Sequence, residues 1–138
     1  MITTLSKRKI LPMNSLPCHF ALKKYTYDDF SKYVYYNNNK YNRITLHKNK
    51  HCEIVLICWN KDQESKIHDH QGKTCVMKIL SGELLEECYS SNSMNSSNSS
   101  NSLISTHILN KSNISLRRHL DSHRIKALNQ SVSLHIYT

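Results

Sequence analysis

The sequence predicts an all-β fold, a jelly roll or barrel preceded by a short helical segment. Short strand-like runs follow one another from residue 41 onward, and no long helical pattern separates them. A His-x-His pair lies between two of these runs. Closely spaced short strands are typical of β-sandwiches and barrels. With only two glycines in the chain, we expect its turns to use Asn, Ser and Asp.

Composition indicates one domain. The chain has 138 residues, 38% of them apolar, and a mean hydropathy of −0.57. We therefore expect a single domain over 1–138, with a helical lead-in over about 1–40 and the barrel over about 41–138. No apolar run approaches the roughly 20 residues that cross a bilayer, so no membrane association is expected. Five cysteines without a C-x-x-C pair are typical of a reducing compartment, and we predict a cytoplasmic monomer.

The formal net charge of +9 raises the question of nucleic acid as a partner. Lys and Arg are scattered along the chain, with no basic helix and no aromatic ladder among them. We therefore interpret the charge as a solvated basic surface that can attract anionic substrates, and we do not expect nucleic-acid binding.

The predicted elements follow in order. Thr26 can cap a helix, Asp28 and Asp29 suit its first turn, and Phe30 with Val34 forms an apolar pair, so we predict a helix to about Tyr36. The predicted strands are Tyr41 to His47, Glu53 to Trp59, Cys75 to Leu80, Glu83 to Tyr89, Leu103 to Leu109, Ile114 to Arg118, His123 to Leu128 and Ser131 to Tyr137. We expect a hairpin about Ser81-Gly82 and a disordered Ser/Asn-rich loop over 90–102.

The segment Ile67-His68-Asp69-His70 contains two candidate metal ligands. Residues two apart on a strand point to one face, so His68 and His70 can direct two imidazoles at one point. This pair is half of a metal site. Imidazoles can hold zinc or ferrous iron. The spacing of His68, His70, Cys75 and Gly82 resembles the general cupin motif, in which a Glu stands at the position of Cys75. A site without an anionic protein ligand favours iron with a substrate that brings its own negative charge, such as a thiolate.

The stretch from Leu56 to Gly82 resembles the first motif of the cysteine dioxygenase branch of the cupins. The matching residues are Leu56, Cys58 and Trp59, then Ile67-His68-Asp69-His70, then Cys75 and Gly82. Leu120-Asp121-Ser122-His123-Arg124-Ile125 resembles the second motif of that family. The resemblance implies a cupin jelly-roll barrel with Fe(II) on His68, His70 and His123. His119 is the alternative third ligand.

The same resemblance implies roles for further residues. Ser133, His135 and Tyr137 match a Ser-x-His-x-Tyr strand whose Tyr faces the iron and whose Ser and His orient it. Cys75 is then the partner of Tyr137 in a thioether. Tyr41 and Arg43 match a Tyr-x-Arg segment whose Arg binds the substrate carboxylate.

The implied activity is a cysteine dioxygenase that uses L-cysteine and O2 and yields cysteine sulfinic acid. One alternative is a dioxygenase for another small thiol, such as 3-mercaptopropionate. Another is a degenerate, non-catalytic metal-binding cupin, motivated by Ala127 in place of the family's Asn and by an end of the chain just after Tyr137.

Overall fold

A computed structural model describes residues 22–90, 102–118 and 121–138. The helical lead-in is short, with an α-helix, α3 (Tyr27–Phe30), followed by a 3₁₀ turn, η1 (Ser31–Tyr33). At its start the Asp29 carboxylate accepts a hydrogen bond from the Thr26 backbone N–H at 2.8 Å. The helix was predicted to reach about Tyr36, but Val34 is already extended. Val34 and Tyr36 pack against the barrel instead of continuing the helix.

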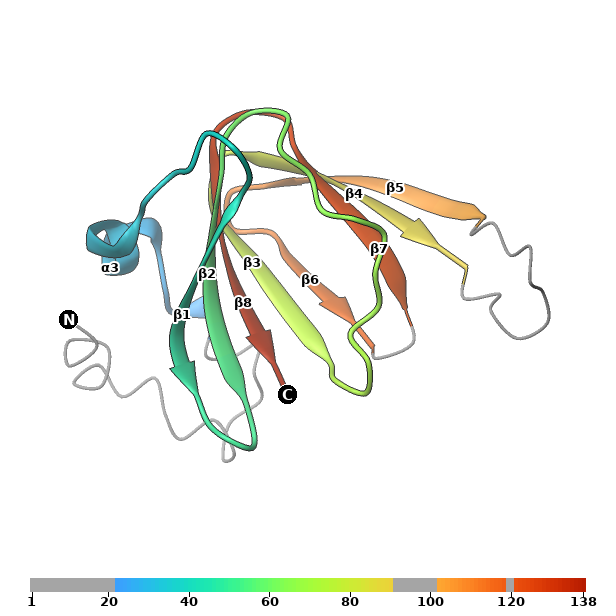
Figure 1. The fold of residues 1–138 in the computed structure, drawn as a ribbon, viewed down its shortest axis with the longest axis horizontal. Helices are drawn as coiled ribbons and strands as arrows, with labels where there is room; N and C mark the ends of the chain where they lie inside the picture. The colour runs from blue at the N-terminus through green and yellow to red at the C-terminus, as the bar shows by residue number, and fades with distance from the viewer. Residues whose placement is uncertain (1–21, 91–101, 119–120) are drawn as a thin grey trace.

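Within the described residues, eight antiparallel strands form two sheets, which confirms the all-β prediction (Figure 1). The five-stranded sheet has the order β1-β2-β8-β3-β6, and the three-stranded sheet has the order β5-β4-β7. The strands are β1 (Asn42–Lys48), β2 (Glu53–Trp59), β3 (Cys75–Ser81), β4 (Glu83–Tyr89), β5 (Leu103–Asn110), β6 (Ile114–Arg117), β7 (Ser122–Ala127) and β8 (Ser131–Tyr137). None of the helices in the described ranges is long and apolar enough to span a membrane.

The predicted hairpin about Gly82 is wrong. β3 pairs with β8 and β6, whereas β4 pairs with β5 and β7, so the chain changes sheets at Gly82. Gly82 has φ +84°, and a side chain there would meet the Ser131 hydroxyl and the Gln130 carbonyl. The Ser131 hydroxyl in turn accepts a hydrogen bond from the Glu83 N–H at 2.9 Å. This corner needs a glycine for both its backbone conformation and its close approach to β8.

Two apolar clusters cover the two faces of the central strands. On the outer face, Leu22 and Phe30 of the lead-in pack on Val132, Leu134 and Ile136 of β8. Between the sheets, the cluster comprises Val55, Ile57, Trp59, Met77, Ile79, Leu84, Ile125 and Ala127. Because the lead-in covers the outer face, β8 is buried on both sides, and its polar row faces the barrel interior.

A buried lysine of β3 also holds the lead-in against the sheet through hydrogen bonds. Lys78 of β3 is 6% exposed. Its Nζ donates hydrogen bonds to the carbonyl oxygens of Leu22, Lys23 and Tyr25 at 2.9, 3.2 and 2.6 Å. Buried polar groups are costly unless they are hydrogen-bonded, so this arrangement ties the lead-in to the sheet.

The connection between β2 and β3 carries the His-x-His pair. It is an irregular segment, not a strand, and isolated bridges at Glu64 with Lys126 and at His68 with His123 fasten it to β7. Backbone hydrogen bonds join His68 and His123 in both directions, at 3.0 and 2.9 Å. The two histidine motifs are therefore brought together by main-chain pairing.

Candidate metal centre

Three histidines converge where the β2–β3 connection meets β7. One ring nitrogen from each of His68, His70 and His123 lies within 4.8 Å of the others. The ring centroids are 4.7 to 5.2 Å apart. His68 and His70 come from the β2–β3 connection, and His123, which is buried, comes from β7. In the described part of the chain this is the one cluster of His, Cys, Asp or Glu with metal-binding geometry.

The hydrogen bonds at the rings assign their free nitrogens. His68 Nδ1 donates to the Lys66 carbonyl at 2.7 Å, and His123 Nδ1 donates to the Glu86 carboxylate at 2.8 Å. Each of these rings therefore keeps its Nε2 lone pair for a ligand. His70 Nδ1 is buried and has no hydrogen-bond partner in the structure. Three converging imidazoles, one of them with an orphaned nitrogen, fit a divalent transition metal such as iron or zinc.

The protonation states agree with this donor set. Burial lowers the pKa of His70 to about 4, with the neighbouring His123 and His68 adding to the shift. Burial also lowers the pKa of His68. Both rings are neutral near pH 7, and a neutral imidazole is the form that binds a metal.

Glu86 was not among the predicted site residues. It lies on β4, is fully buried, and bonds to His123, Ser115 and Arg117. Burial would raise its pKa, but the hydrogen bonds from His123 and Arg117 prevail and lower the pKa to about 2. One sequence signal could have found it, because Glu86 shares strand parity with the buried Leu84 and Cys88.

A second polar row faces the centre from β8. Trp59 Nε1–H donates to Ser133 Oγ at 3.0 Å, and Ser133 Oγ lies 2.8 Å from His135 Nε2. If the Ser133 hydroxyl donates to Nε2, the ring proton is on Nδ1, which is 3.5 Å from the Tyr137 oxygen. Burial lowers the pKa of His135 well below its usual range and raises the pKa of Tyr137, so both are neutral. Trp59 was likewise missed as a member of this row.

Cys75 and Tyr137 face each other in the register of the adjacent strands β3 and β8. They are direct cross-strand neighbours, not partners across the barrel. Cys75 Sγ lies 3.9 Å from His135 Nδ1. Burial raises the pKa of the Cys75 thiol to about 12, so it is protonated near neutral pH.

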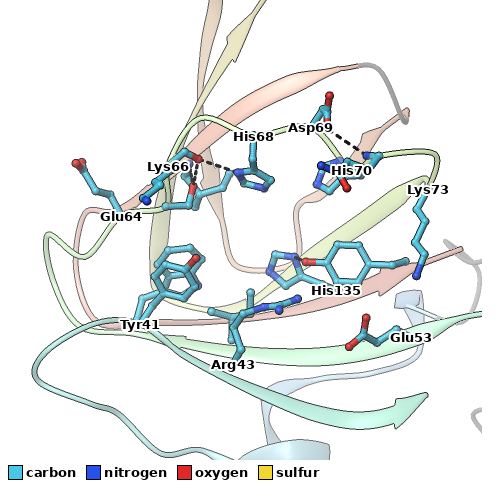
Figure 2. Close-up of a pocket in the computed structure, with 16 residues that line it drawn as sticks. Tyr41, Arg43, Glu53, Glu64, Lys66, His68, Asp69, His70, Lys73 and His135 are labelled. Atoms are coloured by element: carbon cyan, nitrogen blue, oxygen red, sulfur yellow. Dashed lines mark hydrogen bonds between the residues drawn. The ribbon is translucent and has the colours of Figure 1, made fainter. Parts of the chain in front are cut away.

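A pocket of about 530 Å³ opens in front of the histidines (Figure 2). His68 and His70 lie on one side of it, and Tyr41 and Arg43 lie on the opposite side. The Tyr41 ring stacks on Trp59 with centroids 4.6 Å apart. The Arg43 guanidinium carbon lies 5.8 Å from the centre of the Tyr137 ring. Arg43 lines the pocket and is exposed.

The alternative third ligand, His119, lies outside the described residues, as does most of the predicted Ser/Asn-rich loop. His47 and His51 are not part of the cluster. In the described part of the chain, Cys52, Cys58, Cys75 and Cys88 form no disulfide.

The comparisons with known proteins agree with this geometry. The family model described as cysteine dioxygenase type I matches residues 12–138. Cysteine dioxygenase type 1 of Rattus norvegicus is 26% identical over 135 residues, covering 90% of this chain and 58% of that protein. The human protein of the same name is 24% identical over 122 residues, covering 80% of this chain and 56% of that protein. The chain thus spans little more than half the length of these relatives.

Solved structures show the same fold. The TT1209 protein from Thermus thermophilus superposes with a TM-score of 0.64 at 15% identity, covering 79% of this chain and 92% of its own. A cupin superfamily protein from Desulfitobacterium hafniense gives a TM-score of 0.62 at 14% identity, covering 77% of this chain and 84% of its own. The predicted cupin fold is therefore confirmed.

Proposed function

Because the chain belongs to the cysteine dioxygenase type I family, we propose that it oxidises L-cysteine with O2 to cysteine sulfinic acid. In this reaction both atoms of O2 are added to the substrate sulfur. The proposed cofactor is Fe(II), held by His68, His70 and His123. The observation that carries the proposal is the convergence of the His68, His70 and His123 imidazoles. A pocket that a small molecule can enter is lined by two of them, His68 and His70.

The donor set favours a thiolate substrate. Within the described residues no carboxylate or cysteine joins the three histidines as a ligand. A divalent ion bound by three neutral ligands keeps its full charge, which an anionic substrate can offset. When bound, ferrous iron supplies the redox chemistry that joins a thiolate to O2.

The pocket walls would hold and orient the substrate. Arg43 stands opposite the histidines, and no carboxylate in the described part of the chain forms an ion pair with it. Its guanidinium can bind the cysteine carboxylate through two parallel hydrogen bonds. Tyr41, stacked on Trp59, would form the adjoining wall.

The polar row of β8 would orient the phenol. If His135 directs its Nδ1 proton at the Tyr137 oxygen, the Tyr137 hydroxyl proton is left to donate into the pocket. Ser133 would fix the His135 ring for this task. We include a thioether between Cys75 and Tyr137 in the proposal, supported by their facing positions on β3 and β8. Forming it removes two hydrogens, with O2 as the oxidant.

We also propose a reducing compartment, the cytoplasm, and a monomeric state. The four described cysteines form no disulfide, which agrees with a reducing compartment.

Oxygen uptake by protein reloaded with Fe(II) tests the function. We expect uptake with L-cysteine, little with cysteamine, which lacks the carboxylate, and none with His68→Ala or His70→Ala. Equal rates with 3-mercaptopropionate would move the substrate to thiols that need no amino group. Stoichiometric zinc in the purified protein, with no uptake after reloading, would favour a non-catalytic metal-binding cupin.

A further inference from the structure

The Glu86 side chain is fully buried, and three neighbouring side chains hydrogen-bond to its carboxylate. Its carboxylate accepts four hydrogen bonds from β6 and β7. Ser115 Oγ donates at 2.9 Å, and His123 Nδ1 donates at 2.8 Å. Arg117 donates through Nε at 2.9 Å and through Nη2 at 3.0 Å. Both oxygens are engaged twice, which fixes the position and the orientation of the carboxylate.

The direction of these bonds determines the tautomer of His123. An ionised carboxylate can only accept hydrogen bonds, so His123 Nδ1, the ring nitrogen that faces Glu86, must carry a proton. The Nε2 lone pair is then directed away from Glu86, on the side of His68 and His70. We propose that Glu86, held by Arg117 and Ser115, is a positioning residue that fixes the tautomer and ring orientation of His123 for metal binding. The inference rests on the proposed function only in that a metal binds the three histidines.

Glu86 is a charged hydrogen-bond partner, whereas neither of the other two rings has one. His68 is held by the neutral Lys66 carbonyl, and His70 Nδ1 has no hydrogen-bond partner in the structure. Among the described residues, Glu86 is thus the one charged group hydrogen-bonded to a member of the cluster. A carboxylate behind a histidine makes the opposite nitrogen a stronger donor, and losing such a partner typically weakens metal binding about 10- to 100-fold.

The same strand offers a matched control. Glu87 is the next residue of β4 and pairs with Arg124 at 2.6 Å, outside the cluster. Glu86→Gln and Glu87→Gln therefore each replace a β4 carboxylate that is bonded to an arginine of a neighbouring strand, Arg117 of β6 or Arg124 of β7. Only the first of them touches a histidine of the cluster.

The experiment measures Co(II) affinity by chelator competition for wild type and both variants. We expect Glu86→Gln to weaken binding about 10- to 100-fold and Glu87→Gln to leave it unchanged. Imidazole ¹⁵N NMR of the metal-free wild-type protein should show His123 protonated on Nδ1. In Glu86→Gln it should show both tautomers, a change that a purely structural role would not produce.

A second variant distinguishes the effect of losing the Glu86 carboxylate from the effect of leaving Arg117 buried without an anionic partner. The double variant Glu86→Gln/Arg117→Gln removes both charges, and we expect it to bind Co(II) as weakly as the single variant. Wild-type affinity in either variant, or His123 protonated on Nε2 in the wild-type protein, would overturn the inference. The NMR result for the wild-type protein does not depend on whether a variant folds. If wild type bound no metal while His123 carried its proton on Nδ1, the proposed function would fail, and with it the role in metal binding.

Discussion

The variant Ser133→Ala tests the hydrogen-bonded polar row of β8 through its effect on the free energy of unfolding. Ser133 is fully buried, accepts from Trp59 Nε1 at 3.0 Å and lies 2.8 Å from His135 Nε2. Removing the hydroxyl leaves both nitrogens buried without this partner. Each buried, unsatisfied polar group costs about 1 to 3 kcal/mol, so we expect the free energy of unfolding to fall by about 2 to 6 kcal/mol. This is a large share of the roughly 5 to 15 kcal/mol typical of a domain.

Urea unfolding of the metal-free protein at pH 7 measures this loss. Ser81→Ala on β3 is the matched control, because the Ser81 hydroxyl makes no hydrogen bond within the described ranges and should change the stability little. Trp59→Phe combined with Ser133→Ala closes a double-mutant cycle, which should give a coupling free energy of about 0.5 to 3 kcal/mol. A loss no larger than that of Ser81→Ala, with no coupling, would refute the bonded row.

Further predictions concern the pocket, the thioether and the lead-in. Arg43→Ala should lower kcat/KM for cysteine about 10- to 100-fold with unchanged iron content, since charge-assisted hydrogen bonds are lost; a silent variant would remove the carboxylate-binding role. After turnover, peptide mass spectra should contain a Cys75–Tyr137 pair lighter by two hydrogens, absent in Cys75→Ser. Lys78→Met should lower the free energy of unfolding by about 2 to 4 kcal/mol, because three carbonyl oxygens lose a charged donor, whereas an unchanged urea midpoint would contradict this. Metal-free protein should lose stability as the pH falls from 6.5 through about 4, because the pKa of His70 is lowered in the folded state and the unfolded chain binds that proton first; a flat profile would contradict this.

Strand positions could be predicted well because apolar runs and turn residues report local structure. β2, β4 and β8 begin and end at the predicted residues. Pairing could not be predicted in the same way. The Ser81-Gly82 step reads as a hairpin turn, and only the contact of Gly82 with β8 reveals that the chain changes sheets there.

The site was predictable where motif spacing coincides with geometry. His68 and His70 were expected on a strand, but bridges to β7 from an irregular connection bring them to His123. Glu86 was missed because a lone glutamate in a strand is more often solvated than buried, although its parity places it with Leu84 and Cys88. Its burial follows from partners on β6 and β7 that lie about 30 residues further along the chain.

The fate of oxygen in the product tests the central claim most directly. Protein reloaded with Fe(II) would be supplied with L-cysteine under ¹⁸O₂ in unlabelled water, and the product analysed by mass spectrometry. A three-histidine thiol dioxygenase predicts cysteine sulfinic acid in which both oxygens on sulfur are labelled, and no product with His123→Ala. Oxygen from water in the product, or cystine as the only product at the rate of free iron, would contradict it.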